Sequence, residues 1–369
     1  MQERRKLCNL VSLQALKVNR AVSIAREPAF RFAPSPNGLL HLGHAYSAIL
    51  TYEMAKKHEG QLYLRIEDID GARSEESFSS AIIRDLHWLG IEWQPPVIYQ
   101  SDHFEIYSGA IRDLIELELL YPCFASRKEI KQALEINVTN RQDPDGAPFY
   151  PALYKYYPKA KAEERIASGE PFALRLHMDK AIERAKQLNS DREKKLSYQA
   201  ITIDSLAENG GGTPGCIAGN ERNTPGCVVG NRRDTPGCVV GNRRDTKEQQ
   251  LSSIPLAAER WGDVVIKRKD TPTSYHLSVV IDDDKHGITH ICRGKDLEAA
   301  TDIHRILQIN LGLAQPIYHH HDLVLYKNDK LSKSKGHPNL FELRENGINP
   351  LDIYKSALLG PSELSKYLP

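Results

Sequence analysis

Strand and helix patterns alternate from the first structured residues onward, and this alternation constrains the fold more than any other feature. The patterned segments are the strand "AFRFA" (29–33), a helix over 42–57, the strand "QLYLRIED" (61–68) and the helix "SEESFSSAIIRDLHWLG" (74–90). The last helix is predicted to be capped by Ser74 and to end at Gly90. A βαβα opening of this kind predicts a parallel sheet and an α/β fold.

The same alternation returns late in the chain. "SYHLSVVIDD" (274–283) and "GITHICRG" (287–294) read as strands, followed by a helix over 297–311 and a strand at "HDLVLY" (321–326). Between the two patterned regions the chain is polar and irregular, which predicts an insertion into the sheet domain. The expected organisation is an N-terminal extension (1–28), a first half-domain (29–120), an inserted α+β subdomain (121–255), a second half-domain (256–345) and a short tail (346–369).

Composition narrows the class of protein. With 369 residues and 40% hydrophobic content, the chain can bury a real core. Lys and Arg number 49 against 48 Asp and Glu, so a polyanion would have to bind a local basic patch. The six cysteines form no C-x-x-C pair, which fits a reducing cytoplasm, and no apolar run is long enough to predict a membrane span.

Two segments are expected to carry no chemistry. Residues 1–28 are basic and lack the apolar run of a secretory signal, which predicts a disordered or mis-started extension, with a targeting peptide as the alternative. Residues 213–245 hold three copies of an eleven-residue repeat, "TPGCIAGNERN" and twice "TPGCVVGNRRD". Its Gly, Pro and Asn content leaves little apolar surface to stack, so we expect a mobile surface loop, with metal or nucleic-acid binding as the alternatives.

The turn "PSPNG" places His41, Gly43 and His44 at the start of a helix. Unpaired backbone N–H groups and the positive end of the helix dipole favour a phosphate there. The two histidines, three residues apart, share one face, and Gly43 has no side chain to block a nucleotide. Taken alone, the pattern is weak evidence and is more typical of two surface histidines.

A second stretch, "KLSKSKG" (330–336), lies near the other end of the chain. Lysines that alternate with small hydroxyl residues suit a mobile loop that can close over a triphosphate, with Lys333 neutralising the charge that develops as pyrophosphate leaves. A solvated basic loop is the alternative for this stretch alone.

Together and in this order, the two stretches resemble the paired ATP motifs of the class I aminoacyl-tRNA synthetases. The resemblance is closest to the glutamyl branch, and it is carried by five blocks: "RFAPSPNGLLHLGH", "LYLRIEDID", "TSYHLSVVIDD", "GITHICRGKDL" and "KLSKSKG". They span most of residues 30–345 apart from the repeat. The resemblance implies a Rossmann-like parallel sheet, with ATP and Mg²⁺ used to activate glutamate. His41, His44 and Lys333 would act on the phosphates, and Gly43 would lie against the nucleotide.

The resemblance also implies a glutamate site. Its members would be Arg31, Phe32, Ala33, Pro34 and Ser35 after the first strand, with Glu67, Tyr275 and Arg293. The chemistry agrees, because a dicarboxylic amino acid needs cations for its carboxylates and an anion for its ammonium group, and arginine grips a carboxylate with two N–H groups.

Two of these residues have alternative roles. Glu67, expected to hold the α-ammonium group, could instead form a salt bridge with Arg65 or Arg73, or bind Mg²⁺ together with Asp68 and Asp70. Arg293, expected with Tyr275 to close on the substrate, could instead pair with Asp296.

The chain departs from the resembled family at a zinc site. The family pattern C-x-C followed by Y-x-x-x-C falls on "CFAS" and "YPALY", where Ala125 and Tyr154 replace two cysteines. Cys123 and Tyr150 alone would hold Zn²⁺ poorly, and in "HHHD" at most His319 and His321 could converge from one strand. We therefore expect no bound zinc and no metal ion held by these histidines.

Only 33 residues follow "KLSKSKG", too few for the helical domain that reads the anticodon. This architecture resembles the glutamyl-Q tRNA(Asp) synthetases, which attach glutamate to the queuosine wobble base. The implied partners are L-glutamate, ATP and queuosine-containing tRNA(Asp), and we expect a cytoplasmic monomer. The alternatives are a truncated glutamyl-tRNA synthetase that charges the 3′ end, a non-catalytic RNA-binding paralogue and a nucleotidyltransferase of small-molecule metabolism.

Deletion of residues 213–245 tests the interpretation of the repeat. Because a Gly/Pro/Asn loop buries little surface, the rate of adenylate formation is expected to stay within a factor of about two to three of the wild type. ATP–pyrophosphate exchange measures it. Loss of folding or of exchange in the deletion variant would show that the repeat is structural.

Overall fold

The computed structural model describes residues 27–136, 141–189, 195–202, 251–327, 329–331 and 337–368. Lys333 and the repeat of residues 213–245 lie outside these ranges, so the expectations for them remain predictions. No helix in the described ranges is long and apolar enough to cross a membrane.

A seven-stranded sheet forms the centre of the molecule, in the order β3-β2-β1-β9-β10-β6-β7. Its strands are β1 (Ala29–Phe32), β2 (Gln61–Ile66), β3 (Gln94–Tyr99), β6 (Ser197–Ile201), β7 (Leu251–Pro255), β9 (His290–Gly294) and β10 (Ile317–His321). Every neighbouring pair is parallel except β6 and β7. The predicted parallel α/β sheet is confirmed.

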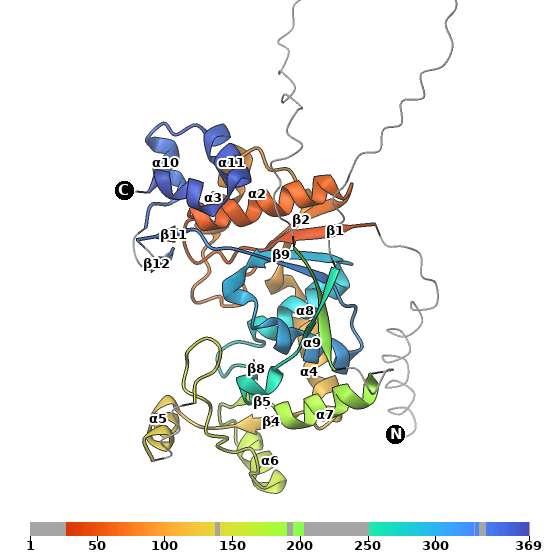
Figure 1. The fold of residues 1–369 in the computed structure, drawn as a ribbon. Coiled ribbons are helices and arrows are strands. Elements are labelled where there is room, and N and C mark those ends of the chain that lie inside the picture. The colour runs from red at the N-terminus through yellow and green to blue at the C-terminus, as the bar shows by residue number, and fades with distance from the viewer. Residues whose placement is uncertain are drawn as a thin grey trace, which may run out of the picture.

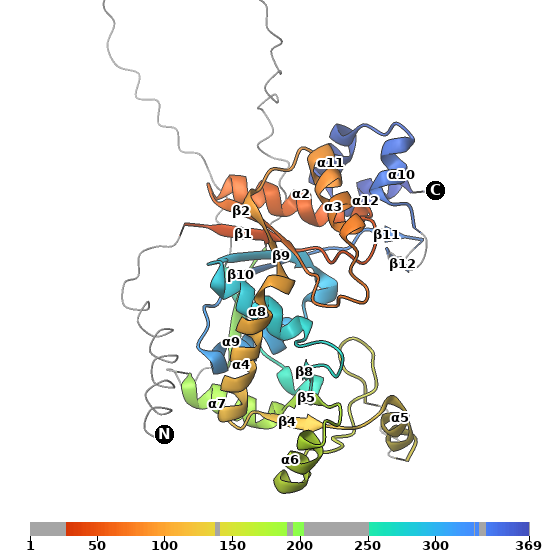
Figure 2. The ribbon, with the colours of Figure 1, turned by 180° about the vertical axis from the view of Figure 1, so that it is seen from behind.

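Helices cover both faces of this sheet (Figures 1 and 2). On one side lie α2 (Leu42–Lys57), α3 (Glu76–Trp88), α10 (Leu340–Glu345), α11 (Pro350–Leu359) and α12 (Pro361–Leu364). On the other lie α4 (Phe104–Glu116), α7 (Met178–Leu188), α8 (Tyr275–Lys285) and α9 (Thr301–Leu311). Each layer has its own apolar core, with Ile49 and Leu64 in the first and Leu114 and Leu277 in the second. Burial on both faces is what a parallel sheet requires.

A smaller antiparallel sheet, β4 (Leu120–Cys123), β5 (Ala173–Leu176) and β8 (Val265–Lys267), carries α5 (Arg127–Ile136) and α6 (Lys159–Ala167). It lies on the side of the molecule away from α10 and α11 (Figure 1). Strand pairing does not follow the expected limits of the insertion, 121–255. Strands β6 and β7 lie within those limits but join the large sheet, whereas β8 lies beyond them and joins the small one.

The strand predicted over residues 274–283 is wrong, because this segment is helix α8. Its Val279, Val280 and Ile281 favour a strand by β-branching, and no polar face marks a helix, since every residue from Leu277 to Asp283 is buried. Helix α8 packs against α4 and α9, so tertiary burial overrides the local preference.

Two smaller expectations also change. Helix α3 starts after Glu75 and has no side-chain cap, so Ser74 is not its N-cap. The strand predicted at 321–326 is divided, because β10 ends at His321 and only Leu325–Tyr326 (β11) pairs, with Asp329–Lys330 (β12). The helix predicted over 297–311 is present as α9 and ends, as expected, at Gly312, which adopts the left-handed conformation with φ 69°.

The region of the expected zinc ligands is held by aromatic and arginine contacts. The Cys123 thiol lies 3.0 Å from the Tyr150 hydroxyl, which donates a hydrogen bond to the carbonyl of Leu153 at 2.6 Å. The guanidinium of Arg165 stacks 4.1 Å from the centre of the Phe124 ring and also faces Tyr154. One thiol and one phenol do not supply the four donors of a structural zinc site.

Measurement of the zinc content tests whether the replacement of the expected ligands abolishes zinc binding. The described residues contain no group of three or more His, Cys, Asp or Glu side chains that could hold a metal ion. With Ala125 and Tyr154 in place of thiolates, elemental analysis of protein purified without chelators is expected to give well under one zinc per chain. A stoichiometric zinc that resists dialysis would contradict this expectation.

Candidate active site

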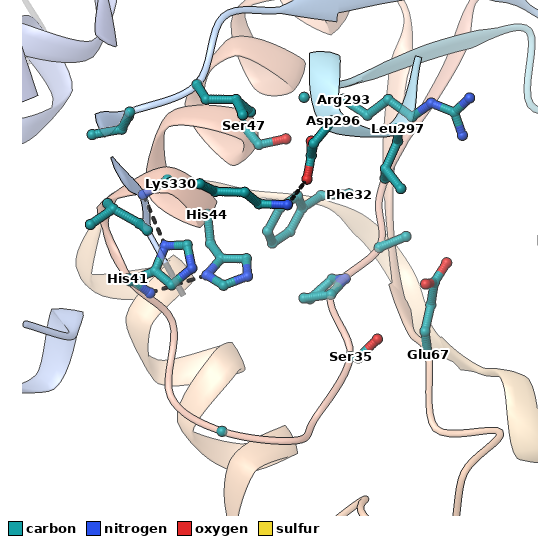
Figure 3. Close-up of a pocket in the computed structure, with 18 of the residues that line it drawn as sticks. Phe32, Ser35, His41, His44, Ser47, Glu67, Arg293, Asp296, Leu297 and Lys330 are labelled. Atoms are coloured by element: carbon teal, nitrogen blue, oxygen red, sulfur yellow. Dashed lines mark hydrogen bonds and ion pairs between the residues drawn. The ribbon is translucent and has the colours of Figure 1, made fainter. Parts of the chain in front are cut away.

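A cavity of about 940 Å³ opens at the carboxyl ends of the parallel strands (Figure 3). Its lining follows directly on β1 and β2 and includes the ends of β9 and β10. Strands β1 and β9 are neighbours, but the chain leaves β1 towards β2 and leaves β9 towards β10, in opposite directions across the sheet. Parallel sheets place ligands at such a switch point.

The sequence-predicted residues meet in this cavity. Those that line it are Arg31, Phe32, Ala33, Pro34, Ser35, His41, Gly43, His44, Glu67, Tyr275 and Arg293. Lys333 lies outside the described residues, but Lys330 and Leu331 before it and His337 after it also line the cavity. The roles assigned to these residues remain proposals; their convergence is a feature of the structure.

His41 and His44 form a reciprocal cap at the start of α2. The backbone N–H of Gly43 donates to His41 Nδ1 at 3.1 Å, and the backbone N–H of His41 donates to His44 Nδ1, also at 3.1 Å. Because Nδ1 of each neutral ring accepts, its proton lies on Nε2. The two rings lie 3.8 Å apart at the cavity wall (Figure 3), so the helix start presents imidazole N–H donors that suit phosphate oxygens.

Gly43 leaves room for the ring of His41 close to the backbone of residue 43. A Cβ atom at this position would lie 3.0 Å from Cε1 and 3.1 Å from Nδ1 of His41. A side chain at residue 43 would therefore require the His41 ring to shift by a few tenths of an ångström.

The two phosphate motifs are joined through the backbone. His41 forms an isolated antiparallel bridge with Asn339, and the N–H of Leu340 donates to the carbonyl of Leu40 at 2.7 Å. Lys330, at the start of the lysine stretch, is paired with Asp296 (Figure 3). Both flanks of the stretch containing Lys333 are thus tied to the cavity wall.

Two buried arginines share one carboxylate beneath the cavity. Asp283 Oδ1 lies 3.2 Å from Nε of Arg31 and 2.6 Å from Nη1 of Arg65, and all three residues are at most 5% exposed. Burial alone would raise the pKa of Asp283, but Arg65 and Arg31 outweigh it and lower that pKa. Asp283 is therefore ionised at neutral pH.

Glu67 combines two of the roles considered for it. Its Oε1 lies 3.1 Å from Nη2 of Arg65, as the internal salt bridge requires, and the residue also lines the cavity. Burial raises the pKa of Glu67 although Arg65 opposes this effect. Arg73 pairs with Asp70 instead.

Arg293 is a buried cation held by neutral acceptors. Its Nη2 donates to Thr301 Oγ1 at 2.7 Å, its Nη1 to His304 Nδ1 at 3.2 Å and its Nε to His320 Nε2 at 3.3 Å. No salt bridge among the described residues includes it, and the alternative partner Asp296 is bound to Lys330.

The histidines around Arg293 carry no charge at neutral pH. Burial and the adjacent Arg293 lower the pKa of His320 to about 2 and that of His276 to about 4, and they hold the pKa of His304 well below its usual range. The charge of Arg293 is therefore available to an anion in the cavity.

The family model described as tRNA synthetases class I (E and Q), catalytic domain, matches residues 29–197 and 242–359. These ranges contain all five sequence blocks that carry the resemblance. The chain belongs to this family. It is therefore a ligase of the aminoacyl-tRNA synthetase type, and the family implies the use of ATP, typically with Mg²⁺.

Relatives within the family differ in length. The chain is 36% identical over 88% of its length to a "Glutamyl-Q tRNA(Asp) synthetase" of Rhodobacter capsulatus and spans 97% of that protein. It is 29% identical to a "Glutamate--tRNA ligase" of Hydrogenobaculum sp., of which it spans 56%. A crystal structure of a glutamate-tRNA synthetase from Elizabethkingia anophelis shares the fold, with TM-score 0.62, 20% identity, and coverage of 92% of this chain and 65% of that one.

Sequence reasoning missed the residues that hold the site together. Asp283 lies in a block of the family resemblance, but a strand at 274–283 gave no reason to place it under Arg31. Thr301, His304 and His320 contact Arg293 across two elements. The sequence shows several histidines in these segments. Which of them contact Arg293 becomes clear only once the order of the strands in the sheet is known.

Substitution of Asp283 tests the charge arrangement under the cavity. Asp283→Asn leaves Arg31 and Arg65 buried without their shared counter-charge and is expected to lower the free energy of unfolding by about 3 kcal/mol. Because the pKa of Asp283 is lowered on folding, its contribution is complete above the unfolded value of about 3.9 and is lost only as the pH falls through the folded value. Urea unfolding at pH 5 and pH 8 should give the same difference.

The matched control is Asp322→Asn, which breaks an exposed pair with Lys295 at 2.6 Å and should cost under about 1 kcal/mol. Equal losses in the two variants would mean that Asp283 is no more than a surface partner.

Proposed function

We propose that this protein activates L-glutamate with ATP and transfers the glutamyl group to the queuosine wobble base of tRNA(Asp). The observation that carries the proposal is one cavity that joins the capped start of α2 to Glu67 and to Arg293, which forms no salt bridge within the part of the chain that the structure describes. The choice of acceptor is supported by the near-complete overlap with the Rhodobacter capsulatus relative, against about half of the length of the glutamate–tRNA ligases.

In the first step, an oxygen of the glutamate α-carboxylate attacks the α-phosphorus of ATP, and pyrophosphate leaves with the electrons of the broken P–O bond. His41 and His44 are suited to donate Nε2–H groups to phosphate oxygens, and Lys333 is assigned to the leaving pyrophosphate. Catalysis then depends on position and charge stabilisation, without a covalent enzyme intermediate.

The cavity wall provides for both charges of the substrate. Arg293 and Arg31 offer guanidinium groups to carboxylates, and Tyr275 offers a hydroxyl that stays protonated because burial raises its pKa. Glu67 offers a carboxylate to the α-ammonium group. The backbone of residues 32–35 borders the same space.

A truncated enzyme that charges the 3′ end of tRNA is the second candidate, since it would use the same residues for adenylate formation. The higher identity to the Rhodobacter capsulatus relative, 36% against 29% for the glutamate–tRNA ligase of Hydrogenobaculum sp., favours the base acceptor. A non-catalytic RNA-binding paralogue would have no need of this charge arrangement, and a nucleotidyltransferase would have no need of the glutamate site.

Alanine at either phosphate motif should slow the first step. His44→Ala and Lys333→Ala are each expected to reduce glutamate-dependent ATP–pyrophosphate exchange by about two orders of magnitude, because each removes one electrostatic contact to the transition state. The exposed His87 and Lys128 provide matched controls, and their alanine variants should exchange at the wild-type rate. Wild-type exchange rates in the His44 and Lys333 variants would contradict the assignment of these two residues to the phosphates of ATP.

The acceptor is tested by transfer of radiolabelled glutamate to tRNA(Asp) with and without queuosine, to queuosine-containing tRNA(Asp) that lacks its 3′-terminal adenosine, and to tRNA(Glu) with and without that adenosine. We expect exchange without any tRNA, transfer only to the two queuosine-containing forms of tRNA(Asp), and no dependence on the 3′ adenosine, since single-stranded loops are read by stacking and edge contacts. Efficient charging of tRNA(Glu) that is lost with the 3′ adenosine would establish the truncated-synthetase alternative.

A further inference from the structure

A chain of hydrogen bonds runs from Arg293 into the interior of the protein through two histidines. Nη1 of Arg293 lies 3.2 Å from Nδ1 of His304, and Nε2 of His304 lies 3.3 Å from Nδ1 of His276. His304 belongs to α9 and is 1% exposed, and His276 belongs to α8. Of these three residues Arg293 alone lines the cavity, so the two histidines lie behind the proposed glutamate site.

The charge of Arg293 fixes the position of each proton along this chain. A guanidinium group only donates hydrogen bonds, so Nδ1 of His304 must accept. Because His304 is neutral, its ring proton then lies on Nε2, and Nδ1 of His276 must accept the next hydrogen bond. The proton of the neutral His276 ring therefore lies on its own Nε2. The other tautomer of His276 would place two N–H groups face to face.

Arg293 is held at three points. Each nitrogen of its guanidinium group donates one N–H to an uncharged acceptor, on His320, His304 and Thr301. Each of the two terminal nitrogens therefore keeps a second N–H for an anion. Three contacts also fix the plane of the guanidinium group, and a two-pronged contact with a carboxylate depends on that plane.

The two histidines also support Tyr275. The rings of His276 and His304 each lie 5.6 Å from the Tyr275 ring, centre to centre, in an edge-to-face arrangement. Tyr275 lines the cavity, as Arg293 does. Both residues in front of the histidines are thus assigned to glutamate.

We propose that His276 is a positioning residue for glutamate: it fixes the tautomer of His304 that holds the Arg293 guanidinium group for a carboxylate of the substrate. This inference rests on the proposed function, which assigns Arg293 to glutamate. His276 does not line the cavity, so it acts through His304 and Arg293 and not on the reacting atoms. Its effect therefore belongs to the KM for glutamate and not to the rate of the chemical step.

His276→Leu removes the acceptor that His304 needs, and His276→Asn restores one, because an amide oxygen can take the place of Nδ1. In ATP–pyrophosphate exchange, His276→Leu is expected to raise the KM for glutamate about ten-fold, while the KM for ATP and kcat stay within about two-fold of the wild type. His276→Asn should keep the KM for glutamate within about three-fold of the wild type. His276→Ala removes the same acceptor without filling its space and should raise that KM in the same way.

His286→Leu is the matched control. His286 is the C-cap residue of the same helix, α8, is half-buried and does not line the cavity, so the variant should change none of these constants. A wild-type KM for glutamate in both His276→Leu and His276→Ala would overturn the proposal. An equal rise of the KM for ATP would overturn it too, because the effect would then not be specific to glutamate.

A double variant separates control of the tautomer from packing. His304→Asn offers an amide oxygen near the position of Nδ1 whatever residue stands at position 276. In that background His276→Leu should therefore change the KM for glutamate no further, since the two residues act through one contact. A second rise of about ten-fold in the double variant would show that His276 acts by packing alone, which would overturn the proposal.

Thermal unfolding gives a readout that does not depend on the stability of each variant. The rise in melting midpoint caused by glutamate is compared with the same variant without glutamate. His276→Leu should show a smaller rise with glutamate and an unchanged rise with ATP and Mg²⁺, and equal losses of both would contradict the proposal.

The wild-type protein separates this inference from the proposed function. If the wild type exchanges pyrophosphate with glutamate and the His276 variants match it, this inference alone fails. If the wild type shows no exchange that depends on glutamate, both proposals fail.

Discussion

The carboxylate of Asp283 is the interaction on which the site depends. It joins Arg31 at β1 to Arg65 at β2 and brings both against α8, so that three elements far apart in the chain meet at one buried anion. Arg65 in turn holds Glu67, and α8 begins with Tyr275. A buried charge is tolerated only when it is paired and hydrogen-bonded. Moving any one of these elements would therefore leave a buried charge without its partner, which would destabilise the fold.

The second constraint is the order of the sheet. Because β1 and β9 are neighbours, the residues that follow β1 face Arg293 on β9, although some 260 residues separate them. The bridge between His41 and Asn339 adds a third distant segment and ties the flank after the lysine stretch to the helix start that this stretch is proposed to serve. The flank before the stretch is held by the pair of Lys330 with Asp296. Catalysis by positioning requires this kind of fixed frame, since the residues themselves are ordinary donors and acceptors.

The sequence predicted what local periodicity and motif chemistry can carry. Helix α2 falls on the expected residues 42–57, and every described residue that was predicted for the site lines the cavity. The prediction from sequence failed at α8, because this helix is buried and lacks the exposed polar face that identifies a helix. It also failed at β6 and β7, because their place in the large sheet depends on pairing between distant segments. Asp283 and the acceptors around Arg293 could not be predicted, because their partners are set by the sheet order and not by spacing in sequence.

The two arginines of the proposed glutamate site differ in what surrounds them, and the difference bears on the proposed substrate. Arg31 shares Asp283 with Arg65, which also pairs with Glu67, so these four groups carry no net charge together. Arg293 lies among Thr301 and neutral histidines and contributes one positive charge that no carboxylate of the described residues pairs with. A site with a net charge of plus one complements glutamate, whose two carboxylates and one ammonium group sum to minus one. Neutral histidines hold the guanidinium in place without competing for it, which a carboxylate at the same position would do.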